Sequence, residues 1–238
     1  MDVIGSSAFI FGENSKFIMA PTATINKSLR EQVYAYFCEL MKKGELTPGK
    51  YINQTEICNE LDISKAPLRD ALIQLETEGF VSILPRRGVI INPLSLEDVA
   101  NAYQILGGLE SVALEQAFHR LGPSHLEEME RINAELLHRL QKGLFDEYYA
   151  LNNELHNIFI DVAANASLKR IVTSLKQRLY DFPLRPYIVE WEKENLREHD
   201  RLIVSIEKGN IRAAMDILRY EHWNFELHQE GIKTFYEF

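Results

Sequence analysis

The chain has 238 residues, 46% of them hydrophobic and 26% charged, with a formal net charge of −9; this composition fits a globular protein of two domains and excludes disordered and fibrous classes. Two cysteines without partners at metal-ligand spacing, Cys38 and Cys58, exclude a disulfide-rich scaffold and are expected to be small buried hydrophobic residues. No basic segment precedes an apolar run and no stretch reaches about 18 apolar residues, so we expect a cytoplasmic protein that neither is secreted nor spans a membrane.

Residues 1–24 show no clear period, and we expect a flexible arm there. A first helix is predicted over Ser28–Lys43, because apolar side chains recur on one face at helical spacing, at Leu29, Val33, Tyr36, Phe37 and Leu40. Gly44 and the turn Thr47–Gly49 end this helix.

Two further helices follow in quick succession. The first is predicted over Gln54–Leu61. Ser64 then supplies a side-chain oxygen that caps the second helix, and Pro67 is tolerated in its first turn. The second helix directs Leu68, Leu72 and Leu75 inward, and Gly79 ends it.

A two-stranded hairpin completes this part of the chain. Its strands are predicted at Val81–Leu84 and Val89–Ile91, with Pro85–Gly88 at the tip and Asn92-Pro93 as the boundary that follows. Helix, turn, helix and hairpin in this order are the plan of a winged helix-turn-helix, whose second helix enters the major groove of DNA. We therefore predict a DNA-binding domain over residues 25–92.

The basic side chains of this domain support DNA contact despite the acidic total. Residues 1–92 hold 10 Lys and Arg against 11 Asp and Glu, whereas residues 93–238 hold 16 against 24. Phosphate binding depends on a local basic patch and not on total charge. The alternative is an ordinary solvated basic face. We predict that the DNA-contacting residues are Thr55, Ser64, Lys65, Ala66, Pro67, Arg69, Arg86, Arg87 and Gly88.

From Ser95 onward the chain reads as helix after helix. Helix stops fall at Gly122-Pro123, Gly143, Asn165, Pro183/Pro186 and Gly209, and no convincing strand pattern appears. Ser95 followed by Asp98 resembles a capping box. We predict a mainly α protein: the winged helix-turn-helix, then an all-α bundle of six or seven helices over residues 93–238.

The predicted winged helix-turn-helix resembles the DNA-binding domain of the GntR family of bacterial regulators. The stretches that carry the resemblance are Leu29–Val33, Gly44–Gly49, Ile63–Leu72, Leu75–Gly79 and Pro85–Gly88. The helical part resembles the FCD-type effector domain of the FadR branch, with Leu109-Glu110, His156, Asn165, Glu198-His199 and Gly209 to Ala214 as the matching residues. Lys65 stands where the family usually has arginine, and Thr55 where some members have one.

This resemblance implies a homodimeric, ligand-responsive transcriptional regulator, most simply a repressor. Its partners would be a pseudo-palindromic double-stranded DNA operator and a small-molecule effector, for which a carboxylate is one candidate. Tyr103, Leu106, Asn152 and Arg178 are the candidate effector contacts. Leu106 replaces an arginine that metal-type members use to bind an effector carboxylate.

Polar groups interrupt an apolar face in the middle of the helical part. Asn152 and His156 are four residues apart, so they share one face of a helix. They continue an apolar strip made of Phe145, Tyr149, Phe159 and Ala163. A histidine on such a face is often a hydrogen-bonded core residue, so this spacing alone leaves its role open.

The turn at Gly209 is expected to bring polar residues of two neighbouring helices to the same height. His199 lies ten residues before this glycine, and Glu221 and His222 lie twelve and thirteen after it. Two antiparallel helices meeting there would descend about 15 Å and climb about 18 Å over these intervals, so His199 can lie level with Glu221 or His222. Imidazole and carbonyl or carboxylate groups converging from separate helices suit a divalent metal.

The FCD resemblance implies a metal held by one Asp and three His. Here Asn152 takes the Asp position, His156 and His199 match, and the last ligand position falls on Glu221, with His222 one residue late. The apolar stripe of this helix centres nearer His222, which favours His222 over Glu221. The resemblance therefore implies a divalent ion of the Zn, Ni or Mn type. Its ligands would be Asn152, His156, His199 and His222, with Glu221 as the alternative to His222.

An enzyme is the alternative class: a helical metal-dependent hydrolase, or else a metal sensor, using His156 and His199. The chain lacks an HExxH motif, a Gly-rich phosphate loop and a nucleophile elbow, so we predict that it is not an enzyme. The remaining histidines are expected on the surface: His119, His125, His138 and His228.

Overall fold

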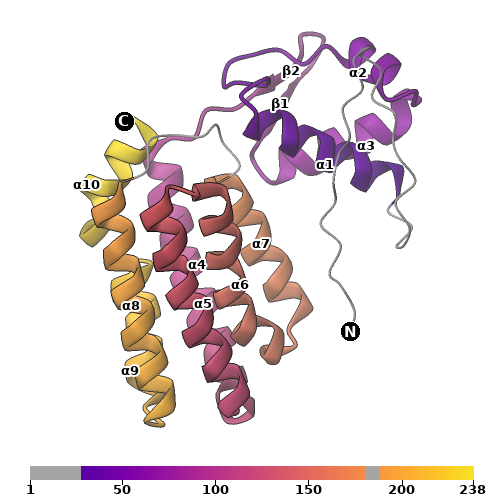
Figure 1. Cartoon of the computed structure of the whole chain (residues 1–238). Helices are drawn as coiled ribbons and strands as arrows, with labels where there is room; N and C mark the ends of the chain where they lie inside the picture. The colour runs from indigo at the N-terminus through magenta and orange to yellow at the C-terminus, as the bar shows by residue number, and fades with distance from the viewer. Residues whose placement is uncertain (1–27, 181–187) are drawn as a thin grey trace. The chain divides into compact units, whose positions relative to one another are not determined.

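The computed structural model describes residues 28–180 and 188–238. They fall into two compact units, and the chain passes from the first to the second between Pro93 and Leu94. Figure 1 shows the elements of both units. The expected arm and the stop at Pro183/Pro186 lie outside the described residues. None of the described helices is long and apolar enough to cross a bilayer.

The first unit contains three helices and a hairpin. Its elements are α1 (Leu29–Lys42), α2 (Gln54–Glu60), α3 (Lys65–Thr77), β1 (Val81–Leu84) and β2 (Gly88–Ile91). A capping box between Ser28 and Glu31 starts α1. Cys38 and Cys58 are free thiols in the core of this unit, as predicted. Leu29, expected on the inner face of α1, is 49% exposed, because the core ends before the first turn of that helix.

The hairpin of the first unit is the wing. Its strands are antiparallel, and Val81 pairs with Ile91. The segment before α2 adds a third, short edge, because Ile52 N–H donates to the carbonyl of Val89 and Ile91 N–H donates to that of Lys50. The predicted strand positions are confirmed, and the pairing at Lys50–Ile52 is an addition that the sequence did not reveal.

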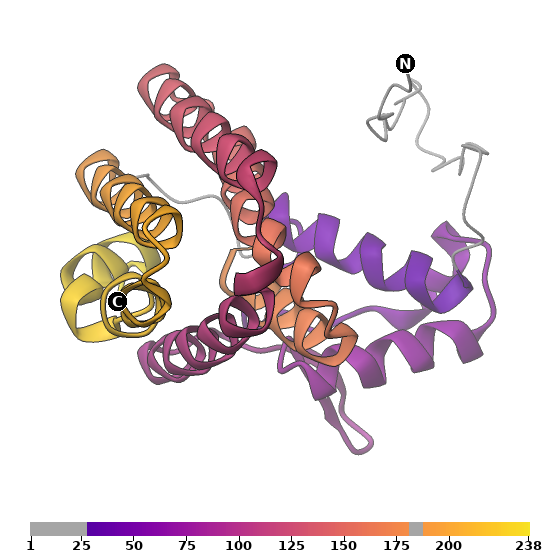
Figure 2. The ribbon, with the colours of Figure 1, turned by 90° about the horizontal axis from the view of Figure 1, so that it is seen from below.

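The second unit is an all-α bundle, as predicted. Its long helices run roughly side by side in Figure 1, and Figure 2 views them nearly along their axes. Its described elements are α4 (Leu96–Ala117), the short 3-10 turn η1 (Phe118–Arg120), α5 (Pro123–Lys142), α6 (Phe145–Ala163), α7 (Ala166–Tyr180), α8 (Val189–Glu207), α9 (Ile211–Asp216), the π-helical turn η2 (Ile217–His222) and α10 (Phe225–Tyr236). The predicted capping box of Ser95 and Asp98 is present at the start of α4.

Five of these elements form a closed ring. α4 packs on α6, α6 on α5, α5 on α8, α8 on η2, and η2 again on α4. Each of the five presents buried apolar side chains to the core of the unit. Polar side chains that point into this ring are therefore removed from water and brought close to one another.

Gly107 permits the close approach of α4 and η2. A Cβ atom at this position would lie 3.1 Å from the Cβ of Trp223 and 3.3 Å from the Cα of Arg219. At the neighbouring Gly108 a Cβ would meet nothing within 4 Å. The two glycines thus offer a matched pair, because an added methyl group raises helix propensity equally at both.

We expect Gly107→Ala to lower the free energy of unfolding by about 1–2 kcal/mol, since overpacking against fixed backbone outweighs the gain in helix propensity. Gly108→Ala should instead raise it by about 0.5–1 kcal/mol. Urea titration followed by tryptophan fluorescence measures both. Equal effects of the two substitutions would contradict a close contact at Gly107.

Candidate functional site

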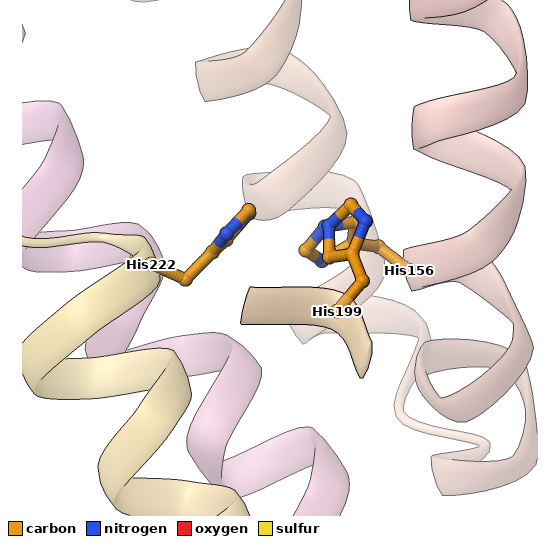
Figure 3. Close-up of side chains that lie close together, drawn as sticks. All are labelled: His156, His199 and His222. Atoms are coloured by element: carbon orange, nitrogen blue, oxygen red, sulfur yellow. The ribbon is translucent and has the colours of Figure 1, made fainter. Parts of the chain in front are cut away.

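Three histidines converge inside the ring of helices. His156 comes from α6, His199 from α8 and His222 from the end of η2, and their side chains point toward one another (Figure 3). One ring nitrogen from each lies within 4.8 Å of the others. The Nε2 atoms of His156 and His199 are 3.2 Å apart. All three side chains are buried.

The second ring nitrogen of each histidine meets an oxygen acceptor. The pairs are His156 Nδ1 with Glu110 Oε2 at 2.7 Å, His199 Nδ1 with Asn133 Oδ1 at 3.1 Å, and His222 Nδ1 with Glu198 Oε2 at 2.9 Å. An acceptor at Nδ1 holds the proton there and leaves the Nε2 lone pair free to bind a cation. α4 and α5 supply Glu110 and Asn133, so every element of the ring contributes to the cluster.

Glu110 is the central acceptor of this network. Besides His156, it binds Trp223 Nε1 at 2.8 Å, and its Oε1 lies 2.6 Å from Lys176 Nζ. Burial by itself raises the pKa of this carboxyl, but His156 and Lys176 beside it hold that pKa well below its usual range. Glu110 is therefore an ionised carboxylate in a fully buried position.

Burial keeps His156 and His199 neutral. It lowers the pKa of His156 to about 4, although the Glu110 carboxylate opposes that change. The pKa of His199 lies well below its usual value, first because of burial and then because of His222 and His156 nearby. Neutral imidazole is the form that binds a metal ion.

Asn152 adds an oxygen beside this cluster. It lies one helical turn before His156 on α6, it is buried, and its Oδ1 has no hydrogen-bond partner among the described residues. A buried carbonyl oxygen without a partner is uncommon and calls for a ligand or a water molecule. Three imidazole nitrogens and this amide oxygen fit the ligand set of a divalent metal of the zinc or nickel type.

The π-helical turn decides which side chain joins the cluster from the last helix. In η2 the bonds run from residue i to i+5, as from Trp223 N–H to the Leu218 carbonyl, so each turn holds one more residue than in an α-helix. His222 consequently points inward. Glu221 is partly exposed and its Oε2 lies 2.6 Å from Arg201.

A small cavity adjoins the histidines. It measures about 10 Å³, room for about one water molecule. Its lining residues are Tyr103, Tyr149, Asn152, Tyr180, Trp191, Glu192, Asn195, His222 and Trp223. Of the four candidate effector contacts, Tyr103 and Asn152 belong to this cavity.

The other two candidates lie elsewhere. Leu106 is fully buried in the hydrophobic core. Arg178 is placed 3.3 Å from Asp98, and it lines a separate cavity of about 130 Å³ between the start of α4 and the end of α7. Arg178 therefore lines a different cavity from Asn152, because the C-terminal end of α7 packs beside the first turns of α4.

His228, expected on the surface, is buried. Its Nδ1 accepts a hydrogen bond from Trp191 Nε1 at 3.0 Å, and its Nε2 lies 3.4 Å from Glu198. It thus links a wall of the cavity to the acceptor of His222. The sequence expectation failed here because α10 folds back against α8, which the helical period of α10 alone does not reveal.

Other members of the network were also missed from the sequence. Lys176 and Asn133 are polar residues in helices whose pattern looks ordinary, and only tertiary packing brings them to the cluster. Glu110 and Glu198 each stood within a stretch that resembled the FCD domain, which is the one signal that pointed to them.

The start of α3 presents exposed polar groups in the first unit. Thr55, Ser64, Lys65, Ala66 and Arg69 are exposed, and Pro67 is partly buried. Ser64 occupies the N-cap position, but its side chain makes no capping hydrogen bond. The reason is Pro67, which stands at the third helical position and has no N–H to donate. The hydroxyl of Ser64 remains available to a phosphate oxygen.

The tip of the wing is a second exposed basic surface. Arg86 and Arg87 are exposed and follow β1, while Gly88 begins β2. Arg86 has φ = 61° and Gly88 has φ = 104°, so the tip is a tight turn. No ion pair links Arg86, Arg87, Lys65 or Arg69 to any other described residue.

Comparison with known families agrees with both units. The model "Bacterial regulatory proteins, gntR family" matches residues 29–91, and the FCD domain model matches residues 101–223. The chain belongs to the GntR family of bacterial regulators. Its FCD domain assigns it to the FadR-like branch.

Curated relatives and solved structures support the same assignment. The chain is 28% identical to the HTH-type transcriptional regulator YdhC of Bacillus subtilis, over 77% of this chain and 83% of that one. It is 21% identical to the HTH-type transcriptional repressor RspR of Escherichia coli, over 82% and 84%. The structure of E. coli McbR/YncC shares the fold, with a TM-score of 0.67 at 19% identity, over 89% and 98% of the two chains.

The function class follows from the family. The protein is a transcriptional regulator whose DNA binding responds to a small molecule held in the FCD domain, and it is not an enzyme. The GntR domain binds DNA, and the FCD domain binds the effector.

Proposed function

We propose that this regulator is a homodimeric repressor that holds a divalent metal ion in its FCD domain. The observation that carries the proposal is the convergence of His156, His199 and His222, each oriented by its own acceptor, beside a cavity. Two copies related by a two-fold axis present two readers, which suits a pseudo-palindromic operator. A protein that binds the bacterial chromosome acts in the cytoplasm.

In this proposal the DNA-contacting residues form two groups, one at the start of α3 and one at the tip of the wing. Lys65 and Arg69 lie one turn apart at the start of α3 and share a face, so they reach guanine acceptors or phosphates in the major groove. Ser64, Ala66 and Pro67 bring the backbone of the helix start to a phosphate. The wing residues Arg86, Arg87 and Gly88 contact the minor groove or the backbone, and Thr55 faces the same DNA from α2.

The metal ligands are His156, His199, His222 and Asn152. Zn, Ni and Mn are the candidate ions, since imidazole suits all three and Asn152 offers an oxygen. The ligands come from α6, α8 and η2, and an ion held by them would supply a Lewis-acidic contact for the effector. The residues around it orient the rings: Glu110, Asn133 and Glu198 keep each Nδ1 protonated.

Effector binding beside the metal ligands shifts the population of dimer states that match the operator spacing. A coupling free energy of about 1–3 kcal/mol corresponds to a change of about 5- to 150-fold in operator affinity. In a repressor, this change releases the DNA. Tyr103 and Asn152 are the effector contacts that the cavity supports.

Gel-shift measurements on the DNA upstream of the protein's own gene test the proposed DNA-binding surface. We expect salt-sensitive, sequence-specific binding, and we expect Arg69→Ala to weaken it by about tenfold or more, because one bidentate base contact contributes about 1–3 kcal/mol. The control is Arg212→Ala, which removes the same charge from an exposed position in α9.

Equal weakening by the two substitutions would show that only total charge matters and would rule out α3 as the reader. Absence of specific binding by the unmodified protein would contradict autoregulation at this operator. Sedimentation equilibrium tests the homodimer: a monomer that still binds a two-half-site operator as one chain contradicts it.

A further inference from the structure

The side-chain amide of Asn133, on α5, connects one of the three converging histidines to a carboxylate at the surface. Its Nδ2 donates to Asp200 Oδ1 at 2.7 Å and to the Leu196 carbonyl at 3.2 Å. Its Oδ1 lies 3.1 Å from His199 Nδ1. Asn133 and His199 are buried, whereas Asp200 is exposed. Asp200 therefore reaches the histidine cluster only through this amide.

The two acceptors at Nδ2 fix which end of the amide faces His199. A flipped amide would place Oδ1 against two oxygen acceptors and would lose both hydrogen bonds, one of them to a carboxylate. In the observed orientation the ring of His199 faces an acceptor. A neutral ring carries one proton, which then lies on Nδ1 and leaves a lone pair on Nε2. Asp200 and the Leu196 carbonyl thus determine the tautomer of His199.

The neighbouring imidazole of His156 favours the opposite tautomer. The Glu110 carboxylate holds the proton of His156 on Nδ1, so its Nε2 also carries a lone pair. The Nε2 atoms of His156 and His199 are 3.2 Å apart. Two lone pairs that face each other in a buried position are unfavourable unless a cation binds both. With its proton on Nε2, His199 would instead donate a hydrogen bond to His156, and neither nitrogen would be free for a cation.

We propose that Asp200 is a positioning residue that holds His199 in the tautomer able to bind a cation. It acts by fixing the amide of Asn133 against the competing hydrogen bond between the two imidazoles. Without the Asp200 carboxylate, Nδ2 of the amide keeps only the uncharged carbonyl of Leu196. The flipped amide then donates to His199 Nδ1, and the ring proton moves to Nε2. This inference rests on the proposed metal site and adds to it a residue that touches neither the ligands nor the ion.

Long-range proton–nitrogen NMR correlations of the histidine rings test the tautomer in the metal-free full chain. We expect the proton of His199 on Nδ1 in the unmodified protein and on Nε2 in Asp200→Ala. Asp200→Asn keeps an oxygen acceptor for Asn133 Nδ2, so it should retain the original tautomer. The signals of His199 are assigned by their absence from the spectrum of His199→Ala. A proton that stays on Nδ1 in Asp200→Ala overturns the inference.

Competition titration of Zn²⁺ with a chelating dye measures the consequence for metal affinity. Asp200→Ala should weaken zinc binding by about fivefold or more, as the loss of one charge-assisted hydrogen bond predicts, and Asp200→Asn should retain most of the affinity. In an Asn133→Ala background, Asp200→Ala should have no further effect, because the amide through which Asp200 acts is gone. An equal effect in both backgrounds would show that only the charge of Asp200 matters, and would overturn the inference.

Asp216→Ala is the control, because it removes the same side chain from an exposed position of α9, and it should change neither the tautomer nor the zinc affinity. The two measurements separate this inference from the proposed function. Absence of zinc binding by the unmodified protein rejects the proposed metal. The tautomer of His199 is measured without metal, so it decides the role of Asp200 in either case.

Discussion

Replacing Glu110 with glutamine is expected to lower the free energy of unfolding of the helical domain by about 3–5 kcal/mol. Glu110 is fully buried, accepts hydrogen bonds from His156 and Trp223, and forms an ion pair with Lys176. The amide keeps the shape of the side chain but removes its charge, which leaves the Lys176 ammonium buried without a counter-ion. Breaking one side of a buried ion pair is far more costly than removing both sides.

Urea titration followed by tryptophan fluorescence measures this effect selectively, because both tryptophans, Trp191 and Trp223, lie in the helical domain. Glu115→Gln on the exposed face of α4 is the control and should change stability by less than about 0.5 kcal/mol. The double substitution Glu110→Gln/Lys176→Met should recover part of the loss. A Glu110→Gln protein as stable as the control would show that Lys176 is not held as an ion pair.

His199→Ala is expected to weaken binding of added Zn²⁺ by more than about 100-fold, because it removes one direct ligand, and loss of an outer partner alone costs about 10- to 100-fold. The substitution leaves no buried charge unpaired: Asn133 retains its hydrogen bonds to Asp200 and to the Leu196 carbonyl. The same variant should lose the stabilisation that metal confers, which is about 2.7 kcal/mol at a free concentration of 100 times Kd.

Elemental analysis of the purified protein and competition titration with a chelating dye measure metal content and affinity. His138→Ala, an exposed histidine of α5, is the control and should leave both unchanged. Unaltered zinc affinity in His199→Ala would remove the metal from the proposal. The DNA-binding function rests on the first unit and would stand.

Local sequence signals predicted the first unit closely. The span of α1, the inward leucines of α3 and the tight turn at Gly88 are determined by residues a few positions apart. The predicted capping hydrogen bond of the Ser64 side chain is absent, and the reason is equally local, because Pro67 has no N–H to donate. The additional pairing of Lys50–Ile52 with the wing joins segments about 40 residues apart and left no pattern in the sequence.

The helical domain was predictable as helices, but its polar interior was only partly so. Helical period placed Asn152 and His156 on one face, and the turn at Gly209 brought His199 level with the last helix. The period could not place Arg178 or His228, because the neighbours of both come from helices distant in sequence.

The sequence by itself determined the class of this protein: a winged helix-turn-helix with exposed cations, followed by an all-α domain that contains histidines on inward faces. Helix caps, turns and hydrophobic periodicity depend on residues that are close in sequence, so they can be predicted without a structure. Only the tertiary structure decided that His222 and not Glu221 joins the cluster, and that Glu110 and Lys176 support it. Those outcomes depend on a π-helical turn and on a ring of five helical elements, whose packing brings together charges from every part of the domain and removes them from water.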